Sequence, residues 1–207
     1  MLNRLMRATM TKVLSPIAHV LLKLGISPDV VTSVGTLGVC FGALAFFPRG
    51  QLWVGVLVIT AFVFSDTVDG IMARASGRST KWGAYLDSTL DRIGDAAIFG
   101  GLVLYYAGRG DNPVMAGLAL ACLILGSVVS YARARAEGLG FTANVGIAER
   151  ADRLVAVLVA TFFADVFDVS LLLGIVLGLL GIASLVTVVQ RMLAVRRQAL
   201  AAGEVSG

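Results

Sequence analysis

Five aspartates, out of thirteen acidic residues in the chain, fall within residues 64–95, FSDTVDGIMARASGRSTKWGAYLDSTLDRIGD. Asp66 and Asp69 are three positions apart, and Asp87 and Asp91 are four apart. Residues at these spacings share one face of a helix, so each pair predicts a helix face carrying two carboxylates. The connection between the two pairs is short, so the helices are expected to be antiparallel neighbours whose carboxylate faces can meet.

Crowded carboxylates need compensating positive charge. Arg74 and Arg92 are the nearby cations and can form at most two ion pairs. An all-oxygen ligand set without His or Cys suits Mg²⁺, Mn²⁺ or Ca²⁺ and argues against zinc. Two such ions about 3.5–4 Å apart would suit a phosphoryl-type displacement. The alternatives are a solvated acidic loop and an interhelical network of ion pairs.

The elements that must position these aspartates are expected to lie in a membrane. The chain has 207 residues, of which 57% are hydrophobic and 14% charged, whereas soluble domains carry about 25% charge. A carboxylate inside a bilayer costs about 2.5–3.5 kcal/mol, which favours a functional role for the cluster. We expect an all-α integral membrane protein with six transmembrane helices, at residues 29–48, 51–75, 82–107, 113–136, 153–167 and 169–193.

Local signals mark some of the ends of these helices. Ser27 followed by Pro28 predicts the N-cap and first residue of the first span. The stretches PRGQ and GRGDNP are expected to be tight turns between spans. Residues 1–24 place apolar side chains on one helical arc interrupted by basic ones, which predicts an amphipathic interfacial helix ahead of a membrane domain at residues 25–207.

Basic residues predict the orientation of the chain. With the N-terminus inside, fourteen of the seventeen Lys and Arg residues lie on the cytoplasmic side. By the positive-inside rule, this favours a multi-pass protein of the cytoplasmic membrane with both termini and the aspartates facing the cytoplasm. The net charge of +4 is therefore explained by membrane orientation and an anion site, and no nucleic-acid partner is expected.

The pattern Asp66-x2-Asp69-Gly70-x2-Ala73-Arg74-x8-Gly83-x3-Asp87-x3-Asp91 resembles the signature of the CDP-alcohol phosphatidyltransferases at all eight of its fixed positions. The resemblance implies a six-helix membrane bundle, commonly a homodimer. It implies that metal ions are held by Asp66, Asp69, Asp87 and Asp91, with Asp91 also acting as general base. It implies two ions per site, Mg²⁺ in preference to Mn²⁺. Residues implied to bind CDP-diacylglycerol are Gly70, Ala73, Arg74, Thr80 and Gly83. Asp95 falls outside the signature and is given no role; it could lie behind the metal site or pack with Arg92.

A second set of residues concerns the acceptor. Arginines in the stretches SYARARAEG, ERADR and QR are expected near the cytoplasmic ends of the last three spans. Clustered guanidinium groups favour an acceptor that carries phosphate, although they could instead be orientation markers that reach lipid headgroups. The wider sequence is similar to the actinobacterial branch of the family that uses an inositol phosphate. That similarity implies an acceptor site formed by Asp29, Ser130, Arg133, Arg135, Arg153 and Arg191.

The expected activity is transfer of the phosphatidyl group of CDP-diacylglycerol to 1D-myo-inositol 3-phosphate (inositol 1-phosphate), giving phosphatidylinositol phosphate and CMP. The alternative acceptor is glycerol 3-phosphate, which would give phosphatidylglycerophosphate. A cation or proton transporter would instead spread acidic residues through the depth of several helices. Asp29 also has a simpler explanation, because negative charge is favourable at a helix N-terminus.

Overall fold

A computed structural model of the chain describes residues 15, 16, 18, 20–63, 68, 70–72, 80–147 and 149–203. The described residues are helical or lie in turns and loops, and none of them forms a strand. They belong to two compact units, Met1–Gly101 and Leu102–Gly207, each of which is described by itself. Four predicted site residues lie outside the described residues: Asp66, Asp69, Ala73 and Arg74. Most of the predicted interfacial helix is also outside them, so that helix and the division at residue 25 stay predictions.

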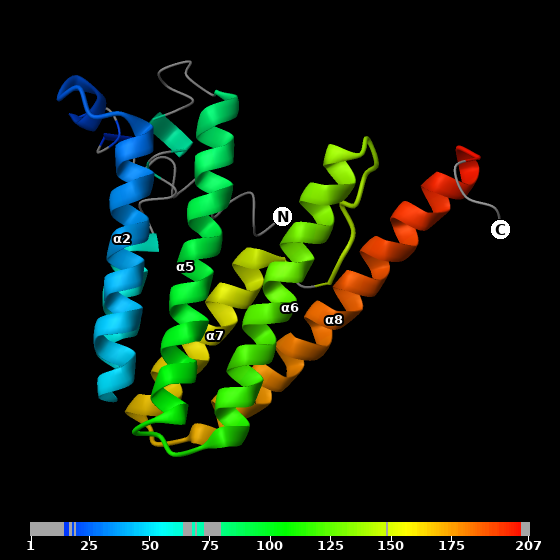
Figure 1. Cartoon of the computed structure of the whole chain (residues 1–207). Coiled ribbons are helices and arrows are strands. Elements are labelled where there is room, and N and C mark those ends of the chain that lie inside the picture. The colour runs from blue at the N-terminus through cyan, green and yellow to red at the C-terminus, as the bar shows by residue number, and fades with distance from the viewer. Residues whose placement is uncertain are drawn as a thin grey trace. The chain divides into compact units, whose positions relative to one another are not determined.

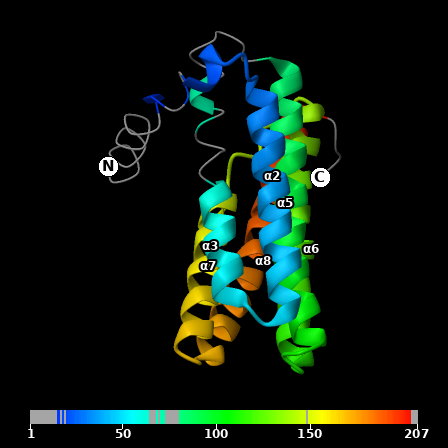
Figure 2. The ribbon, with the colours of Figure 1, turned by 90° about the vertical axis from the view of Figure 1, so that its left-hand side faces the viewer.

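The first unit is built on a helical hairpin of α2 (Pro28–Phe46) and α3 (Leu52–Val63), joined by the short helix η1 (Phe47–Arg49) (Figure 2). The Ser27 hydroxyl caps α2 by accepting a hydrogen bond from the Val30 amide at 3.4 Å, as the sequence predicts. Glycines bring the two helices close together. A Cβ on Gly55 would lie 2.6 Å from the Phe47 ring and 2.9 Å from the carbonyl oxygen of Gly42.

Residues 81–101 of helix α5 (Lys81–Ala107) belong to the first unit and pack against α2. A Cβ on Gly101 would lie 3.0 Å from the carbonyl oxygen of Ala43, so the absence of a side chain there favours this close approach. The described residues near the N-terminus also pack on this unit: Ala18 is fully buried in a cluster with Val68, Ile71 and Met72. Gly70 lies in the same helical stretch as Ile71 and Met72 and is partly buried.

The second unit contains α6 (Pro113–Gly138), α7 (Arg150–Val166) and α8 (Ser170–Ala201), with α8 in contact with both of the others (Figure 1). Asn112 caps α6, because its side-chain oxygen accepts a hydrogen bond from the Met115 amide at 3.1 Å. The predicted turn GRGDNP therefore ends at a helix cap. Inside the unit, the buried Cys122 thiol donates to the carbonyl oxygen of Leu177 at 3.2 Å and joins α6 to α8.

Three described helical segments are long and apolar enough to cross a bilayer: Pro28–Arg49, Pro113–Gly138 and Ser170–Ala201. By length and composition, these three helices are candidate membrane spans. Within the expected span 51–75, the structure describes the shorter apolar helix α3, of 12 residues, and the helical residues 68 and 70–72. Helix α8 continues beyond residue 193, because the segment 194–201, AVRRQALA, consists mainly of good helix formers. The total of six spans stays a prediction.

Candidate active site

The N-terminus of α5 positions the first group of predicted site residues. Thr80 precedes the helix, and its hydroxyl accepts a hydrogen bond from the Gly83 amide at 2.9 Å, which caps the first turn. A Cβ on Gly83 would lie 3.3 Å from this hydroxyl and 3.7 Å from Oδ1 of Asp29. The structure therefore brings Thr80 and Gly83, predicted to bind the donor, against Asp29, predicted to bind the acceptor.

Asp87 and Asp91 follow along α5, one helical turn apart. The Asp87 residue is exposed and the Asp91 side chain is 21% exposed, so both carboxylates can be reached by a ligand. The other two predicted metal ligands precede α5 and are not described. Among the described residues, no group of three or more His, Cys, Asp or Glu side chains could hold a metal ion. The described half of the cluster is therefore an oxygen-donor pair on one helix face.

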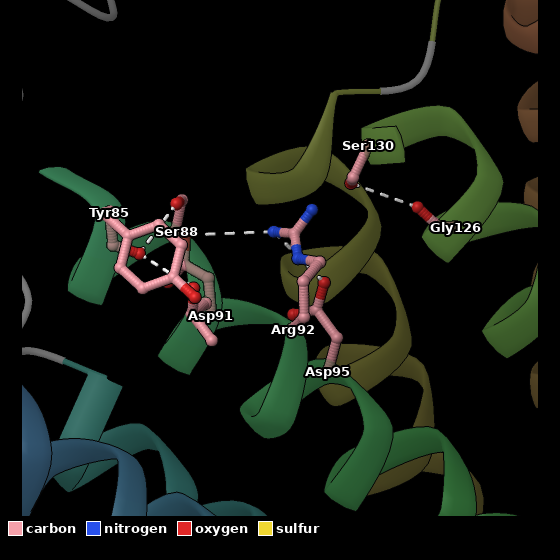
Figure 3. A network of polar contacts seen from close by, with 8 residues as sticks. Tyr85, Ser88, Asp91, Arg92, Asp95, Gly126 and Ser130 are labelled. Atoms are coloured by element: carbon pink, nitrogen blue, oxygen red, sulfur yellow. Dashed lines mark hydrogen bonds and ion pairs between the residues drawn. The ribbon is translucent and has the colours of Figure 1, made fainter. Parts of the chain in front are cut away.

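Arg92 lies between two aspartates of α5 (Figure 3). Its Nη2 is 3.5 Å from Oδ2 of Asp95 and 3.8 Å from Oδ2 of Asp91. Asp95 is the more buried partner, with 12% of its side chain exposed. A buried carboxylate requires such a partner, so Asp95 provides the closer counter-charge for Arg92, and the contact with Asp91 is at the outer limit of an ion pair.

Arg153 and Ser130 meet at one glycine of α6. Arg153 lies in the first turn of α7 and is 2% exposed. Its Nε and Nη2 are each 3.5 Å from the position that a Cβ on Gly126 would take. The Ser130 hydroxyl donates to the carbonyl oxygen of Gly126 at 3.1 Å (Figure 3). Gly126 was not predicted as a site residue, and its signal in the sequence is only that it lacks a side chain one helical turn before Ser130.

Arg191 is also buried, with 8% of the residue exposed. Its Nε donates to the carbonyl oxygen of Val145 at 3.0 Å, and its Nη1 donates to that of Val129. These bonds tie α8 to α6 and to the segment before α7. Two guanidinium nitrogens of Arg191, Nε and Nη1, are therefore engaged with backbone.

Arg133 and Arg135 differ from the two buried arginines, because both are exposed. The Arg133 Nε donates to Oε1 of Glu137 at 2.8 Å, with both side chains about half exposed. An exposed pair of this kind contributes little to stability and can exchange for another anion. Two positions on a helix differ by roughly 200° in direction, so Arg135 does not share a face of α6 with Arg133.

The near-complete burial of Arg153 and Arg191 is inconsistent with side chains that only reach lipid headgroups. A headgroup contact requires the charged end to remain accessible. The exposure of Arg133 and Arg135 remains compatible with that alternative. Thus the arginine cluster predicted from the sequence contains two buried members and two surface members.

A segment between α6 and α7, residues 142–147, runs along α8 and is held by three side chains of that helix. Gln198 bonds to Thr142, Arg191 to Val145, and the Thr187 hydroxyl accepts a hydrogen bond from the Ile147 amide at 3.2 Å. Positions 187, 191 and 198 lie on one face of α8. Beside this contact is an open cavity of about 300 Å³ lined by Val145, Gly146, Ile147, Gln190, Leu193, Ala194 and Arg197. The segment therefore fixes the carbonyl group of Val145, which orients Arg191.

Comparison with known proteins assigns the class. The family model for CDP-alcohol phosphatidyltransferase matches residues 25–189. The chain belongs to this family and is a phosphotransferase.

Within the family, particular relatives can be named. The chain is 52% identical over 204 residues to the phosphatidylinositol phosphate synthase of Streptomyces avermitilis, a match that covers 96% of this chain and 84% of that protein. The crystal structure of the Mycobacterium tuberculosis phosphatidylinositol phosphate synthase with CDP-DAG bound matches at TM-score 0.85 and 41% identity, covering 89% of this chain and 94% of that one. The same enzyme in complex with manganese and citrate matches at TM-score 0.82 and 42% identity, covering 88% of each chain.

Proposed function

We propose that the protein transfers the phosphatidyl group of CDP-diacylglycerol to inositol phosphate, 1D-myo-inositol 3-phosphate, and releases phosphatidylinositol phosphate and CMP. The name shared by its relatives and the CDP-DAG bound to one of them at 41% identity support the choice of donor and acceptor. The observation that carries the proposal is the pair of accessible carboxylates on α5, at positions where the family signature requires them.

The carboxylates Asp66, Asp69, Asp87 and Asp91 would hold two divalent ions, Mg²⁺ in preference to Mn²⁺. The described pair fits such ions, since both members offer accessible oxygen atoms and no softer ligand lies among them. A manganese complex of a relative at 42% identity supports a divalent metal. When bound, the ions would stabilise charge on the pyrophosphate and on the departing CMP.

Asp91 would act as the general base. An alcohol has a pKa far above neutrality, so its proton must pass to a base within hydrogen-bond reach as the oxygen attacks. The acceptor hydroxyl gives its proton to the Asp91 carboxylate and forms a bond to the β-phosphorus of the donor. The bond between that phosphorus and the bridging oxygen breaks, and CMP leaves with this oxygen. The ion pair between Arg92 and Asp95 supports this role, because it gives Arg92 a closer partner than Asp91.

The donor would be bound by Gly70, Ala73, Arg74, Thr80 and Gly83, and the acceptor by Asp29, Ser130, Arg133, Arg135, Arg153 and Arg191. The position of two Arg153 guanidinium nitrogens beside Gly126 supports a phosphate contact there, because guanidinium groups bind phosphate through paired hydrogen bonds. Glycerol 3-phosphate carries the same phosphate and is the competing acceptor. Glycerol 3-phosphate would leave the part of the site that binds the acceptor's hydroxyl groups less well filled.

We further propose a homodimer in the cytoplasmic membrane, with both termini and the site facing the cytoplasm. The positive-inside distribution of Lys and Arg supports the orientation. Arg109→Cys and Gly138→Cys, each in a variant lacking the two native cysteines, test it in intact cells. Only the first should react with a membrane-impermeant thiol reagent from outside, and labelling of the second would contradict the orientation.

The activity itself is tested with purified protein in lipid nanodiscs by measuring CMP release. Release should require CDP-diacylglycerol, inositol phosphate and a divalent ion, and should stop when a chelator is added. Asp91→Asn should lower the rate by about 10²–10⁴-fold, whereas Asp111→Asn, a matched change in an exposed turn, should leave it unchanged. Metal-independent release, or a fully active Asp91→Asn variant, would refute the proposed mechanism.

A further inference from the structure

The indole of Trp82 is hydrogen-bonded to Asp29. Its Nε1 donates to Oδ2 of the carboxylate at 3.1 Å and joins the first turn of α5 to the first turn of α2, 53 positions earlier in the chain. The other carboxylate oxygen, Oδ1, faces the Cβ position of Gly83 at 3.7 Å. The two oxygens of Asp29 therefore have different surroundings: one is held by Trp82, and the other lies beside a glycine.

Helix α2 does not depend on Trp82 for its own N-terminus. Ser27 caps the helix, and Pro28 occupies its first position. The favourable effect of the Asp29 charge on the helix dipole needs only the position of that charge, so it leaves the side-chain torsions unrestricted. The hydrogen bond from Trp82 therefore adds orientation, which neither the cap nor the dipole requires.

The protein itself covers less than half of Trp82. The residue is 60% exposed, and its ring packs in a tilted arrangement with Tyr85, which is 62% exposed, at 5.9 Å between ring centroids. The indole has one hydrogen-bond donor and no acceptor, and that donor is directed at a carboxylate. Charge-assisted bonds of this type are the stronger ones, so this bond can hold the carboxylate in one orientation.

We propose that Trp82 is a positioning residue for the acceptor: its indole N–H fixes the Asp29 carboxylate so that Oδ1, beside Gly83, is presented to hydroxyl groups of the polyol. This inference rests on the proposed function, which places Asp29 in the acceptor site. A carboxylate accepts hydrogen bonds from hydroxyl groups and repels phosphate. Asp29 thus recognises the polyol part of the acceptor and not its phosphate.

The test is steady-state kinetics of Trp82→Phe, which keeps an aromatic ring and removes the donor. The KM for inositol phosphate should rise about fivefold, the effect of losing one charge-assisted hydrogen bond in a partly exposed position. The KM for CDP-diacylglycerol and the kcat at saturating acceptor should stay within about twofold. A purely structural role for Trp82 would change the constants for both substrates together, and that result would overturn the inference.

Two further variants complete the experiment. Trp53→Phe removes the only other tryptophan of the chain, in α3, and should leave both KM values unchanged. Asp29→Asn should raise the acceptor KM, and the Asp29→Asn/Trp82→Phe double variant should be no worse than Asp29→Asn alone, because the two residues act as one unit. An unchanged acceptor KM in Asp29→Asn would remove Asp29 from the proposed site. If the acceptor KM rises in Asp29→Asn but is unchanged in Trp82→Phe, the inference about Trp82 is overturned and the proposed function is not.

Discussion

Arg92 and Asp95, three positions apart on α5, form an ion pair in which Nη2 of the arginine lies 3.5 Å from Oδ2 of the aspartate. Asp91 lies 3.8 Å from the same nitrogen and is less buried than Asp95. Asp95 is outside the family signature, yet its carboxylate supplies the closer charge for the one arginine within this helix. The two aspartates therefore differ in role: Asp95 is the structural partner of Arg92, and Asp91, one turn earlier, is the proposed general base.

Asp95→Asn should therefore weaken both the fold and the activity. It leaves the guanidinium of Arg92 without its closer partner, and the free energy of unfolding should fall by about 1–3 kcal/mol. Arg92 is then expected to pair with Asp91 and reduce its basicity, which lowers kcat. Thermal unfolding in detergent and CMP release measure the two effects. The Arg92→Gln/Asp95→Asn double variant is the control and should regain stability. If Asp95→Asn alone were as stable as the wild type, the ion pair between Arg92 and Asp95 would be contradicted.

Arg153→Lys should raise the KM for inositol phosphate by more than about tenfold, because an ammonium group cannot reproduce the planar, multidentate contacts of a buried guanidinium. The KM for CDP-diacylglycerol should change little. Arg109→Lys, the same substitution in an exposed turn, serves as the matched control. Equal effects of Arg153→Lys on the two substrates would show that Arg153 supports the fold instead of binding the acceptor.

Gly146→Ala should be strongly destabilising. Gly146 has φ of +148°, and a Cβ there would lie 2.4 Å from Cγ2 of Thr187. We expect a loss of about 2–4 kcal/mol in the free energy of unfolding. Gly138→Ala at the end of α6, where a Cβ meets nothing within 4 Å, should be neutral or slightly stabilising. Similar unfolding temperatures for the two variants would mean that the segment 142–147 does not lie against α8.

Gln198→Ala should release one end of that segment. The Gln198 amide donates to the carbonyl oxygen of Thr142 at 2.7 Å and accepts from the Thr142 amide at 2.9 Å. Hydrogen exchange at the Thr142 amide should accelerate at least about tenfold once its acceptor is gone. Gln190→Ala is the matched control on α8, since the side-chain oxygen of Gln190 is buried with no hydrogen-bond partner among the described residues. Equal exchange rates of the Thr142 amide in the two variants would contradict the hydrogen bonds between Gln198 and Thr142.

Local signals predicted several helix starts but not the contacts between helices. Ser27 with Pro28 and the turn before Pro113 mark where α2 and α6 begin, because caps depend on neighbouring residues. The bond from Trp82 to Asp29 and the bonds from Arg191 to backbone carbonyls join residues 46–62 positions apart. No spacing rule reaches that far, so such contacts were outside the reach of pattern analysis.

The arginines show the same limit of sequence analysis, because their contacts could not be predicted from their residue type. All four were predicted to form the acceptor site, since the sequence shows where positive charge lies but does not show what each side chain touches. In the structure, Arg191 bonds to two carbonyl groups and Arg133 to Glu137, whereas Arg153 lies along the backbone of Gly126. The family signature was more informative, because its spacing fixes which residues share one face of α5.

The central claim is most directly tested by supplying both candidate acceptors at once. Purified protein in nanodiscs is given CDP-diacylglycerol and Mg²⁺ with equal concentrations of inositol phosphate and glycerol 3-phosphate, and the lipid products are separated by mass spectrometry. We expect phosphatidylinositol phosphate to form in large excess, with CMP released in equal amount. Phosphatidylglycerophosphate as the main product would contradict the assigned acceptor, and no lipid product from either acceptor would contradict the transferase activity itself.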